Sequence, residues 1–308
     1  MVSIRRNSIE QADPPRSPRE TLPTMYDLPS EDPEEPGLPD EFHDLQPQLL
    51  SRTLQLTRYS RDNCFTASDL NLYYDVNHSR WYKRPDWFLA VNVPRLYEQR
   101  ELRRSYVTWQ EGKPPYIVIE FLSPGTEAED LGRFYDEASK VPTSEFIASI
   151  PSTVTDESEE AAKEKPPNKF EVYEEYLRVP HYIVYSRYTQ RLRYFKLDGG
   201  KYREQSLNLE HPLIWLTDLE IGLDIWQGEF EEATSAWLRW CDRNGNWLLT
   251  DTEQAQQQVK QERQAKEQAQ TQLLHAARNL LSTGMEMEQV AQILGLSEAQ
   301  IEALRHLN

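Results

Sequence analysis

The chain has 308 residues, a net charge of −17, and 38% hydrophobic and 11% aromatic residues. This length fits one large domain with appendages or two small domains. Two cysteines are too few for a disulfide framework or a cysteine-based zinc site, and they indicate a reducing, cytoplasmic compartment. A run of about 18 apolar residues and an apolar signal core are both missing, so we expect no membrane span and no secretory signal. The acidic balance argues against non-specific polyanion binding as the main activity.

Residues 1–39 are rich in proline and acidic side chains. Such a composition cannot bury enough apolar surface to offset the entropy lost on ordering, so we expect a flexible segment. The next residues, 40–56, predict the first helix in spite of Pro47, because apolar side chains recur at helical spacing. These side chains are Phe42, Leu45, Leu49, Leu50 and Leu54.

Residues 64–123 have the β-branched and aromatic content of strands, with prolines at the edges of the runs. The range 126–167 is acidic and of low complexity, which indicates a surface insertion or long loop. A short amphipathic helix then begins after Asn168 as its N-cap. A strand at 181–187, a hairpin turning at 198–200 and two further strand pairs follow, the last turning at Asn244-Gly245. Strands with few helices predict an α+β or mixed-sheet domain over residues 40–250.

Residues 251–282 are rich in Gln, Ala, Glu and Lys and lack Pro and Gly, so they predict one long helix. Its first part is polar all round, as in a solvated helix or half of a weak coiled coil that joins copies of the chain. Residues 283–308 predict two short helices around Gly295-Leu296, with Val290, Ile293 and Leu294 inside. This unit resembles a helix-turn-helix, but residues 297–304 hold two acids and no base. We therefore favour a packing or protein-interaction role over DNA reading.

Two carboxylates are the candidate functional residues. Asp86 opens one predicted strand, and Glu120 lies near the end of another, 34 residues later. The start of one antiparallel strand lies beside the end of its neighbour, so the two could meet and form an oxygen-lined site that suits Mg²⁺. Glu120 interrupts the apolar run YIVIEFLS, where an unpaired carboxylate is unfavourable without a metal, a basic partner or a place at a sheet edge. The alternatives are a solvent-facing Glu120 and an Asp86 that serves only a turn.

Several motifs recur in one order: RPD, VIEFLSPGTEAEDLG, NKFEVYEEYLRVPHYIVYSR and the late WLRWCDRNGNWL. This order resembles the "Uma two" family of putative restriction endonucleases, in the PD-(D/E)XK nuclease superfamily, over about residues 40–250. The resemblance implies a restriction-endonuclease-like core, with a central mixed sheet flanked by helices. It also implies a bound Mg²⁺ or Mn²⁺ and hydrolysis of phosphodiester bonds in DNA by a metal-activated water.

By this resemblance, Asp86 and Glu120 are catalytic metal ligands. The third position of the E-x-K motif holds Leu122 in place of lysine, and Lys169 on the following helix is the candidate replacement. Lys169 and Tyr173 are four residues apart and share a helix face. The alternatives are a solvated lysine in the first turn and a tyrosine that belongs to the core.

The completeness of this site is left open by the sequence. An upstream acid often completes such sites, and Glu41 and Asp44 are the candidates. The missing lysine, the acidic charge and the acidic insertion favour a second interpretation, a catalytically silent nuclease fold that serves as an interaction scaffold. We expect the prominent aromatic residues to belong to the core rather than to stack on bases. These are Trp81, Tyr82, Trp87, Trp109 and Trp215.

Overall fold

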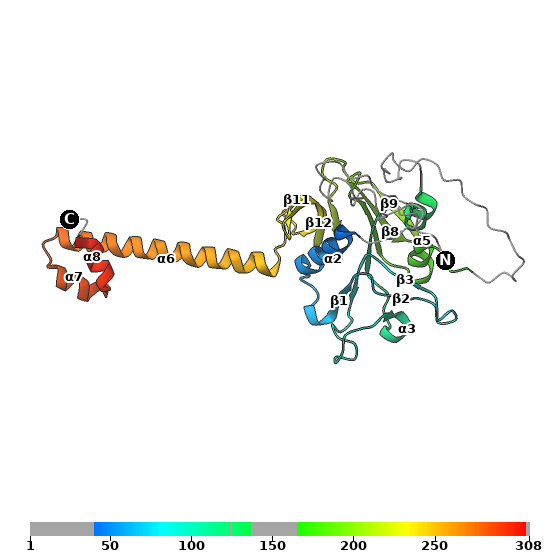
Figure 1. Cartoon of the computed structure of the whole chain (residues 1–308), viewed down its shortest axis with the longest axis horizontal. Coiled ribbons are helices and arrows are strands. Elements are labelled where there is room, and N and C mark those ends of the chain that lie inside the picture. The colour runs from blue at the N-terminus through cyan, green and yellow to red at the C-terminus, as the bar shows by residue number, and fades with distance from the viewer. Residues whose placement is uncertain (1–39, 124, 137–164, 306–308) are drawn as a thin grey trace, which may run out of the picture. The chain divides into compact units, whose positions relative to one another are not determined.

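The computed structural model describes residues 40–123, 125–136 and 165–305 (Figure 1). The predicted flexible segment 1–39 and most of the predicted insertion lie outside the described residues. The chain divides into two compact units, Met1–Leu248 and Leu249–Asn308.

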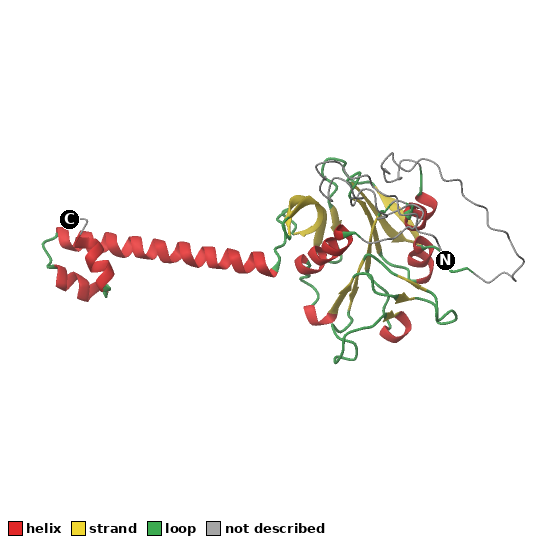
Figure 2. Ribbon diagram, in the orientation of Figure 1, coloured by secondary structure: helices red, strands yellow, loops and turns green. Residues whose placement is uncertain are grey.

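The first unit is mixed in secondary structure (Figure 2). Its helices are α2 (Glu41–Thr53), α3 (Thr108–Glu111), α4 (Glu127–Leu131) and α5 (Lys169–Glu171), with the 3-10 turns η1 (Arg61–Asn63) and η2 (Gly132–Phe134) and the π-helical turn η4 (Val172–Tyr176). Its strands are β1 (Cys64–Ala67), β2 (Leu72–Tyr73), β3 (Tyr82–Lys83), β4 (Trp87–Val91), β5 (Tyr106–Val107), β6 (Ile117–Phe121), β7 (His181–Ser186), β8 (Arg191–Asp198), β9 (Lys201–Gln205), β10 (Ile214–Leu216), β11 (Ile221–Phe230) and β12 (Ala233–Cys241).

A six-stranded sheet in the order β1-β4-β6-β7-β8-β9 forms the centre. β6 and β7 are parallel, and the other neighbours are antiparallel. A parallel pair needs a long crossover connection, and the one from β6 to β7 carries α4, η2, α5 and η4. Two three-stranded sheets, β10-β11-β12 and β3-β2-β5, accompany the central one. The prediction of an α+β protein with a mixed sheet is confirmed.

Both faces of the central sheet are buried. Side chains alternate along a strand, so Ile117, Ile119 and Phe121 of β6 face one core, while Val118 faces the other. The first core packs the sheet against α2 and the β10-β11-β12 sheet, and Figure 1 shows α2 beside β12. The second core packs it against α5, η4 and the small β2 and β5 strands. Glu120 lies two residues after Val118, so its side chain is on the same face of the sheet and points into the second core.

The helix and hairpin signals of the first unit are largely confirmed. The Asp40 side chain caps α2, and Asn168 forms a capping box with Glu171 at α5. The β8–β9 hairpin turns at 199–200, as predicted. The late hairpin is different: β11 and β12 are joined at Glu231-Glu232, and the Asn244-Gly245 turn leads only to an isolated bridge between Cys241 and Trp247.

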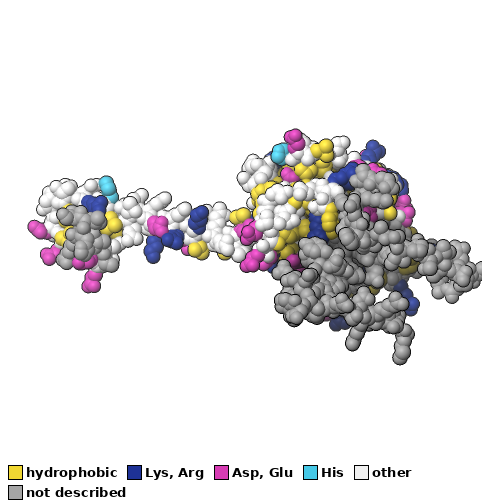
Figure 3. All heavy atoms as spheres, turned by 45° about the horizontal axis from the view of Figure 1, so that its top comes forward, with side chains coloured by type: hydrophobic (Ala, Val, Ile, Leu, Met, Phe, Trp, Pro, Cys, Tyr) yellow, Lys and Arg dark blue, Asp and Glu magenta, His cyan; other side chains and the backbone are white. Residues whose placement is uncertain are grey.

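The second unit consists of α6 (Asp251–Ser282), α7 (Met287–Leu294) and α8 (Glu298–Arg305). Thr250 and Glu253 form a capping box at α6, and the predicted single long helix is confirmed. Figure 3 shows that the visible face of α6 is mostly uncharged and polar, with interspersed acidic and basic side chains. Val290 is fully buried, whereas Ile293 is 64% exposed, so its predicted interior position is wrong. Among the helices of the described residues, none has the length and hydropathy to span a membrane.

Candidate active site

The pairing of β4 with β6 brings the two predicted carboxylates together. Trp87 lies opposite Ile119 in this antiparallel pair, so one further step of the register places Asp86 opposite Glu120. The Asp86 amide donates a hydrogen bond to Glu120 Oε2 at 3.2 Å, and the Phe121 amide donates one to Asp86 Oδ2 at 2.5 Å. Directly opposed residues share a sheet face, so both side chains belong to one cluster.

Lys169 and Tyr173 approach Glu120 from the helical segment above the sheet. Lys169 Nζ lies 3.0 Å from Glu120 Oε2, and the Tyr173 hydroxyl donates to Glu120 Oε1 at 2.6 Å. The capped start of α5 places Lys169 next to the sheet, and Tyr173 lies in the π-helical turn η4, a distortion that is frequent at functional sites. Lys169 is thus mostly buried and pairs with Glu120. It brings to the cluster the cation that Leu122, at the lysine position of the motif, does not supply, because Leu122 packs in the second core.

Asp130 is a third acid that the sequence did not single out. Its side chain is 1% exposed, and its Oδ1 lies 3.3 Å from Lys169 Nζ. Asp130 belongs to α4, which begins the range expected to be a surface insertion. The turn after α4 packs closely against α5, and this contact sets the position of Asp130. The contact is so close that a Cβ added at Gly132 would lie 2.8 Å from Phe170 Cγ. Only glycine permits this close approach, which holds Asp130 beside Lys169.

The substitution Gly132→Ala is expected to lower the free energy of unfolding by about 2–3 kcal/mol, because it adds a clash with Phe170 to a positive-φ backbone. Gly112→Ala is the matched control: Gly112 also has positive φ, but no other atom lies within 4 Å of the place that an added Cβ would take. We expect the control to lose only about 1 kcal/mol. Urea unfolding midpoints would measure both, and equal losses would contradict the role of the Phe170 contact.

The electrostatics of the cluster follow from burial. Burial, together with the neighbouring Asp86, raises the pKa of Glu120 to about 8, against the opposing effects of Lys169 and Tyr173. Burial likewise raises the pKa of Asp86, and it raises the pKa of Asp130 to about 7. Burial alone would favour a neutral Lys169, but the surrounding carboxylates raise its pKa well above the ordinary value. Three acids therefore share one permanent cation, and a further positive charge would stabilise their ionised forms.

The first turn of α2 adds a histidine rather than an acid. His43 Nδ1 lies 2.8 Å from Asp40 Oδ1, and His43 Nε2 lies 3.2 Å from Oγ of Ser123, two residues after β6. The charge of His43 acts to lower the pKa of Asp86, although burial of Asp86 outweighs it. The structure does not bring Glu41 or Asp44 to the cluster, because both side chains are exposed on α2.

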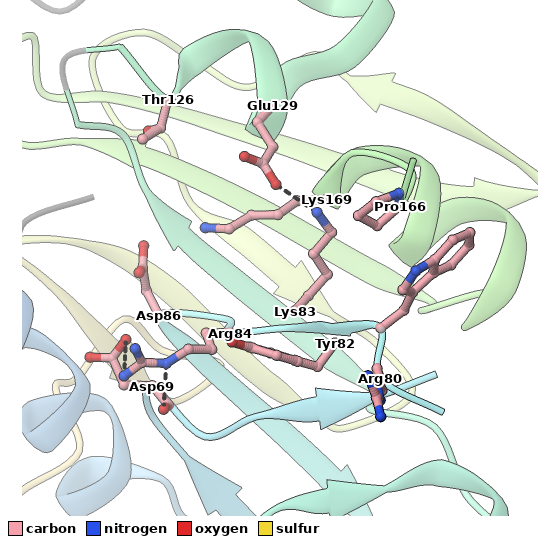
Figure 4. A pocket seen from close by; sticks show the side chains of 11 residues that line it. Asp69, Arg80, Tyr82, Lys83, Arg84, Asp86, Thr126, Glu129, Pro166 and Lys169 are labelled. Carbon is pink, nitrogen blue, oxygen red and sulfur yellow. Dashed lines mark hydrogen bonds and ion pairs between the residues drawn. The ribbon is translucent and has the colours of Figure 1, made fainter. Parts of the chain in front are cut away.

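A pocket of about 480 Å³ opens onto this cluster (Figure 4). Asp86 and Lys169 belong to its lining, and Figure 4 shows the Lys169 amine directed toward the Asp86 side of the pocket. Residues 80–84, next to and within β3, form one wall, and Glu129 of α4 lies across from them. The pocket gives a ligand access to Asp86 and Lys169, while Glu120 lies behind them with no exposed surface.

The donor chemistry of the cluster fits a hard cation. Asp86 and Glu120 offer adjacent carboxylate oxygens, and the buried Oδ1 of Asp130 accepts no hydrogen bond from the described residues. Within the described part of the chain, no group of three His, Cys, Asp or Glu side chains could hold a metal ion by itself. Water and substrate oxygens would therefore complete the ligand set, which is usual for Mg²⁺ held by one or two carboxylates.

The mixed central sheet flanked by helices is consistent with a nuclease-like core. The model of the Uma2 family, described as "Putative restriction endonuclease", matches residues 16–226, more than half of the chain. The protein belongs to this family. Comparisons with curated proteins and with solved structures gave no match.

Proposed function

We propose that this protein is a metal-dependent endonuclease that hydrolyses phosphodiester bonds in DNA. The observation that carries the proposal is the convergence of three charged side chains: Asp86 just before β4 and Lys169 of α5, which line one pocket, and Glu120 of β6 behind them. Family membership supports the reaction class, because the family is described as "Putative restriction endonuclease". Buried charged side chains are unfavourable for folding, so their concentration here supports a functional role.

Each residue has a role that its contacts support. Asp86 and Glu120 would hold Mg²⁺ or Mn²⁺, which supplies a water of lowered pKa and stabilises charge on a phosphoryl oxygen. Lys169 presents a positive charge to the pocket, where a phosphate would approach. Tyr173 fixes the orientation of Glu120 through its hydrogen bond, and Asp130 fixes the position of Lys169 through the ion pair. These last two are positioning residues.

The test is cleavage of a supercoiled plasmid and of a single-stranded DNA circle by the full-length protein. We expect cleavage with Mg²⁺ or Mn²⁺ and none with EDTA. The variant Asp86→Asn removes one charge beside the pocket and should lower the rate by about 10²-fold or more. Cleavage that persists in EDTA, or that Asp86→Asn leaves unchanged, would contradict the proposal.

A catalytically silent scaffold is the second candidate, and one observation favours it. Both oxygens of Glu120 already accept hydrogen bonds from Tyr173, Lys169 and the Asp86 amide, and its side chain is fully buried. Such a cluster is electrostatically satisfied in part without any metal. Thermal unfolding with and without Mn²⁺ separates the two candidates, since an ion that binds the folded state raises the melting temperature. A scaffold would show neither this shift nor cleavage.

A further inference from the structure

The wall of the pocket formed by residues 80–84 reads Arg-Trp-Tyr-Lys-Arg, and all five residues line the pocket. With Lys169, four cations line the pocket against three acids, in a chain whose net charge is −17. Among the side chains that line the pocket, cations therefore outnumber acids, and Glu120 and Asp130, which pair with Lys169, lie behind this lining. A phosphate-bearing ligand is the kind of molecule that such a local surface attracts.

Two aromatic side chains lie between these cations. Tyr82 is 45% exposed, so the prediction that it belongs to the core is wrong. The Trp81 ring is partly exposed and stacks on the His78 ring at a centroid distance of 3.9 Å, which holds its plane fixed. Alternating cations and exposed aromatic rings are the pattern by which proteins bind single-stranded nucleic acid, because bases stack on the rings and phosphates contact the cations.

The dimensions of the pocket favour one strand over two. Its volume of about 480 Å³ is within the range of sites that enclose one small ligand. One nucleotide unit has this scale, whereas a base-paired duplex does not. Asp86 and Lys169 line the pocket and Glu120 lies fully buried behind them, so a reacting phosphate has to enter the pocket itself.

We infer that this pocket binds one unpaired DNA strand, with Arg80 and Arg84 contacting its phosphates and Tyr82 stacking on a base. The inference rests on the proposed function for the choice of DNA, and it names the form of DNA that the site accepts. Arg84 is 55% exposed at the side chain and lies 3.6 Å from Asp69, so its guanidinium is oriented but still accessible. Arg80 is exposed, and its side chain forms no ion pair within the described residues.

An ion pair across the pocket occupies part of the path of the strand. Lys83 Nζ lies 2.8 Å from Glu129 Oε1, and Figure 4 shows this pair joining the β3 wall to α4. The Lys83 side chain is 13% exposed, while Glu129 is 45% exposed. Glu129 thus takes the place that a strand phosphate would take on Lys83. Removing the charge of Glu129 should free Lys83 for the strand and strengthen binding.

The experiment measures fluorescence anisotropy of a short labelled oligonucleotide, single-stranded or annealed to its complement, with the full-length protein. Ca²⁺ replaces Mg²⁺, and a denaturing gel checks that the oligonucleotide stays intact. We compare the wild type with Arg80→Met/Arg84→Met, Tyr82→Ala and Glu129→Gln. The matched control is Arg191→Met/Arg203→Met, which removes two exposed arginines of β8 and β9 that do not line the pocket.

We expect the wild type to bind the single strand at least about tenfold more tightly than the duplex. The double variant Arg80→Met/Arg84→Met should weaken binding by about tenfold and lower the slope of log K against log salt by about 1.4, or 0.7 for each lost phosphate contact. Tyr82→Ala should weaken it by about tenfold, and Glu129→Gln should strengthen it by about threefold.

Equal affinity for duplex and single strand, or an equal loss in the control and in Arg80→Met/Arg84→Met, would overturn the inference. The binding measurement does not depend on whether the protein cleaves DNA. Strand binding with this variant pattern but without cleavage in Mg²⁺ would support the inference and contradict the proposed function. Cleavage in Mg²⁺ by a protein whose pocket variants bind like the control would support the function and overturn the inference.

Discussion

Replacing Glu120 by glutamine is expected to lower the rate of DNA cleavage by about 10³-fold while leaving the protein at least as stable as the wild type. The activity falls because Glu120 is the point at which the Asp86 amide, Lys169 and Tyr173 meet, and glutamine lacks the carboxylate that would hold the metal. Single-turnover cleavage in Mg²⁺ measures the rate. Glu175→Gln, on an exposed residue of the same helical segment, is the control and should cleave like the wild type.

The expected stability of Glu120→Gln has a defined pH dependence. Burial raises the pKa of Glu120 from 4.5 to about 8, so the folded state holds its proton more strongly than the unfolded state does. Its contribution to stability is complete below about pH 4.5 and is lost as the pH rises through about 8. Glutamine does not titrate. The difference in urea midpoint should therefore shift in favour of the variant between these two pH values. A shift toward the wild type would contradict a buried carboxylate whose partners compensate its charge only in part.

The cleavage rate and the stability of Glu120→Gln together distinguish a functional cluster from a structural ion pair. A residue kept for stability should weaken the fold when it is neutralised, whereas a residue kept for chemistry can be removed with no loss or with a gain in stability. Wild-type stability above that of Glu120→Gln at all pH values, with no cleavage by either protein, would favour the silent scaffold.

The part of the site that the sequence predicted depends on local rules. Asp86 opens one apolar run and Glu120 interrupts another near its end, so antiparallel pairing of the two strands is enough to bring them together. The sequence predicts Asn168 as the N-cap of the helix that carries Lys169, and the structure shows it capping that helix together with Glu171. Both predictions needed only alternation along strands and the chemistry of a helix end.

The part that the sequence did not predict depends on contacts between distant segments. Asp130 lies in an acidic stretch, and only the close approach of Gly132 to Phe170 shows that it turns inward. The long hairpin of β11 and β12 was missed for a different reason. It turns at Glu231-Glu232, both with positive φ, whereas Asn-Gly is the usual residue pair for such a turn. Strand pairing over nine residue pairs outweighs the unfavourable backbone of two glutamates.

Glu174→Gln is expected to lower the free energy of unfolding by about 2–3 kcal/mol, since it removes the charge of a buried carboxylate that accepts several hydrogen bonds. Glu174 is 1% exposed and accepts two hydrogen bonds from Arg133, at 2.8 and 2.7 Å, and one from the Tyr202 amide. These contacts tie η4, and with it Tyr173, to η2 and β9. Glu175→Gln is again the control: Glu175 shares the Lys201 partner but is exposed, so we expect a loss below about 1 kcal/mol.

The pH dependence of the Glu174 effect has the opposite sign to that of Glu120. Although Glu174 is buried, hydrogen bonds from Arg133 and the Tyr202 amide lower its pKa below 4.5. A carboxyl with a lowered folded pKa stabilises the protein above its unfolded pKa and loses that contribution as the pH falls through the folded value. The gap in urea midpoint between wild type and Glu174→Gln should therefore narrow below about pH 4.5. A gap that widens on acidification, or a Glu175→Gln loss as large as that of Glu174→Gln, would show that the buried pair does not hold η4 in place.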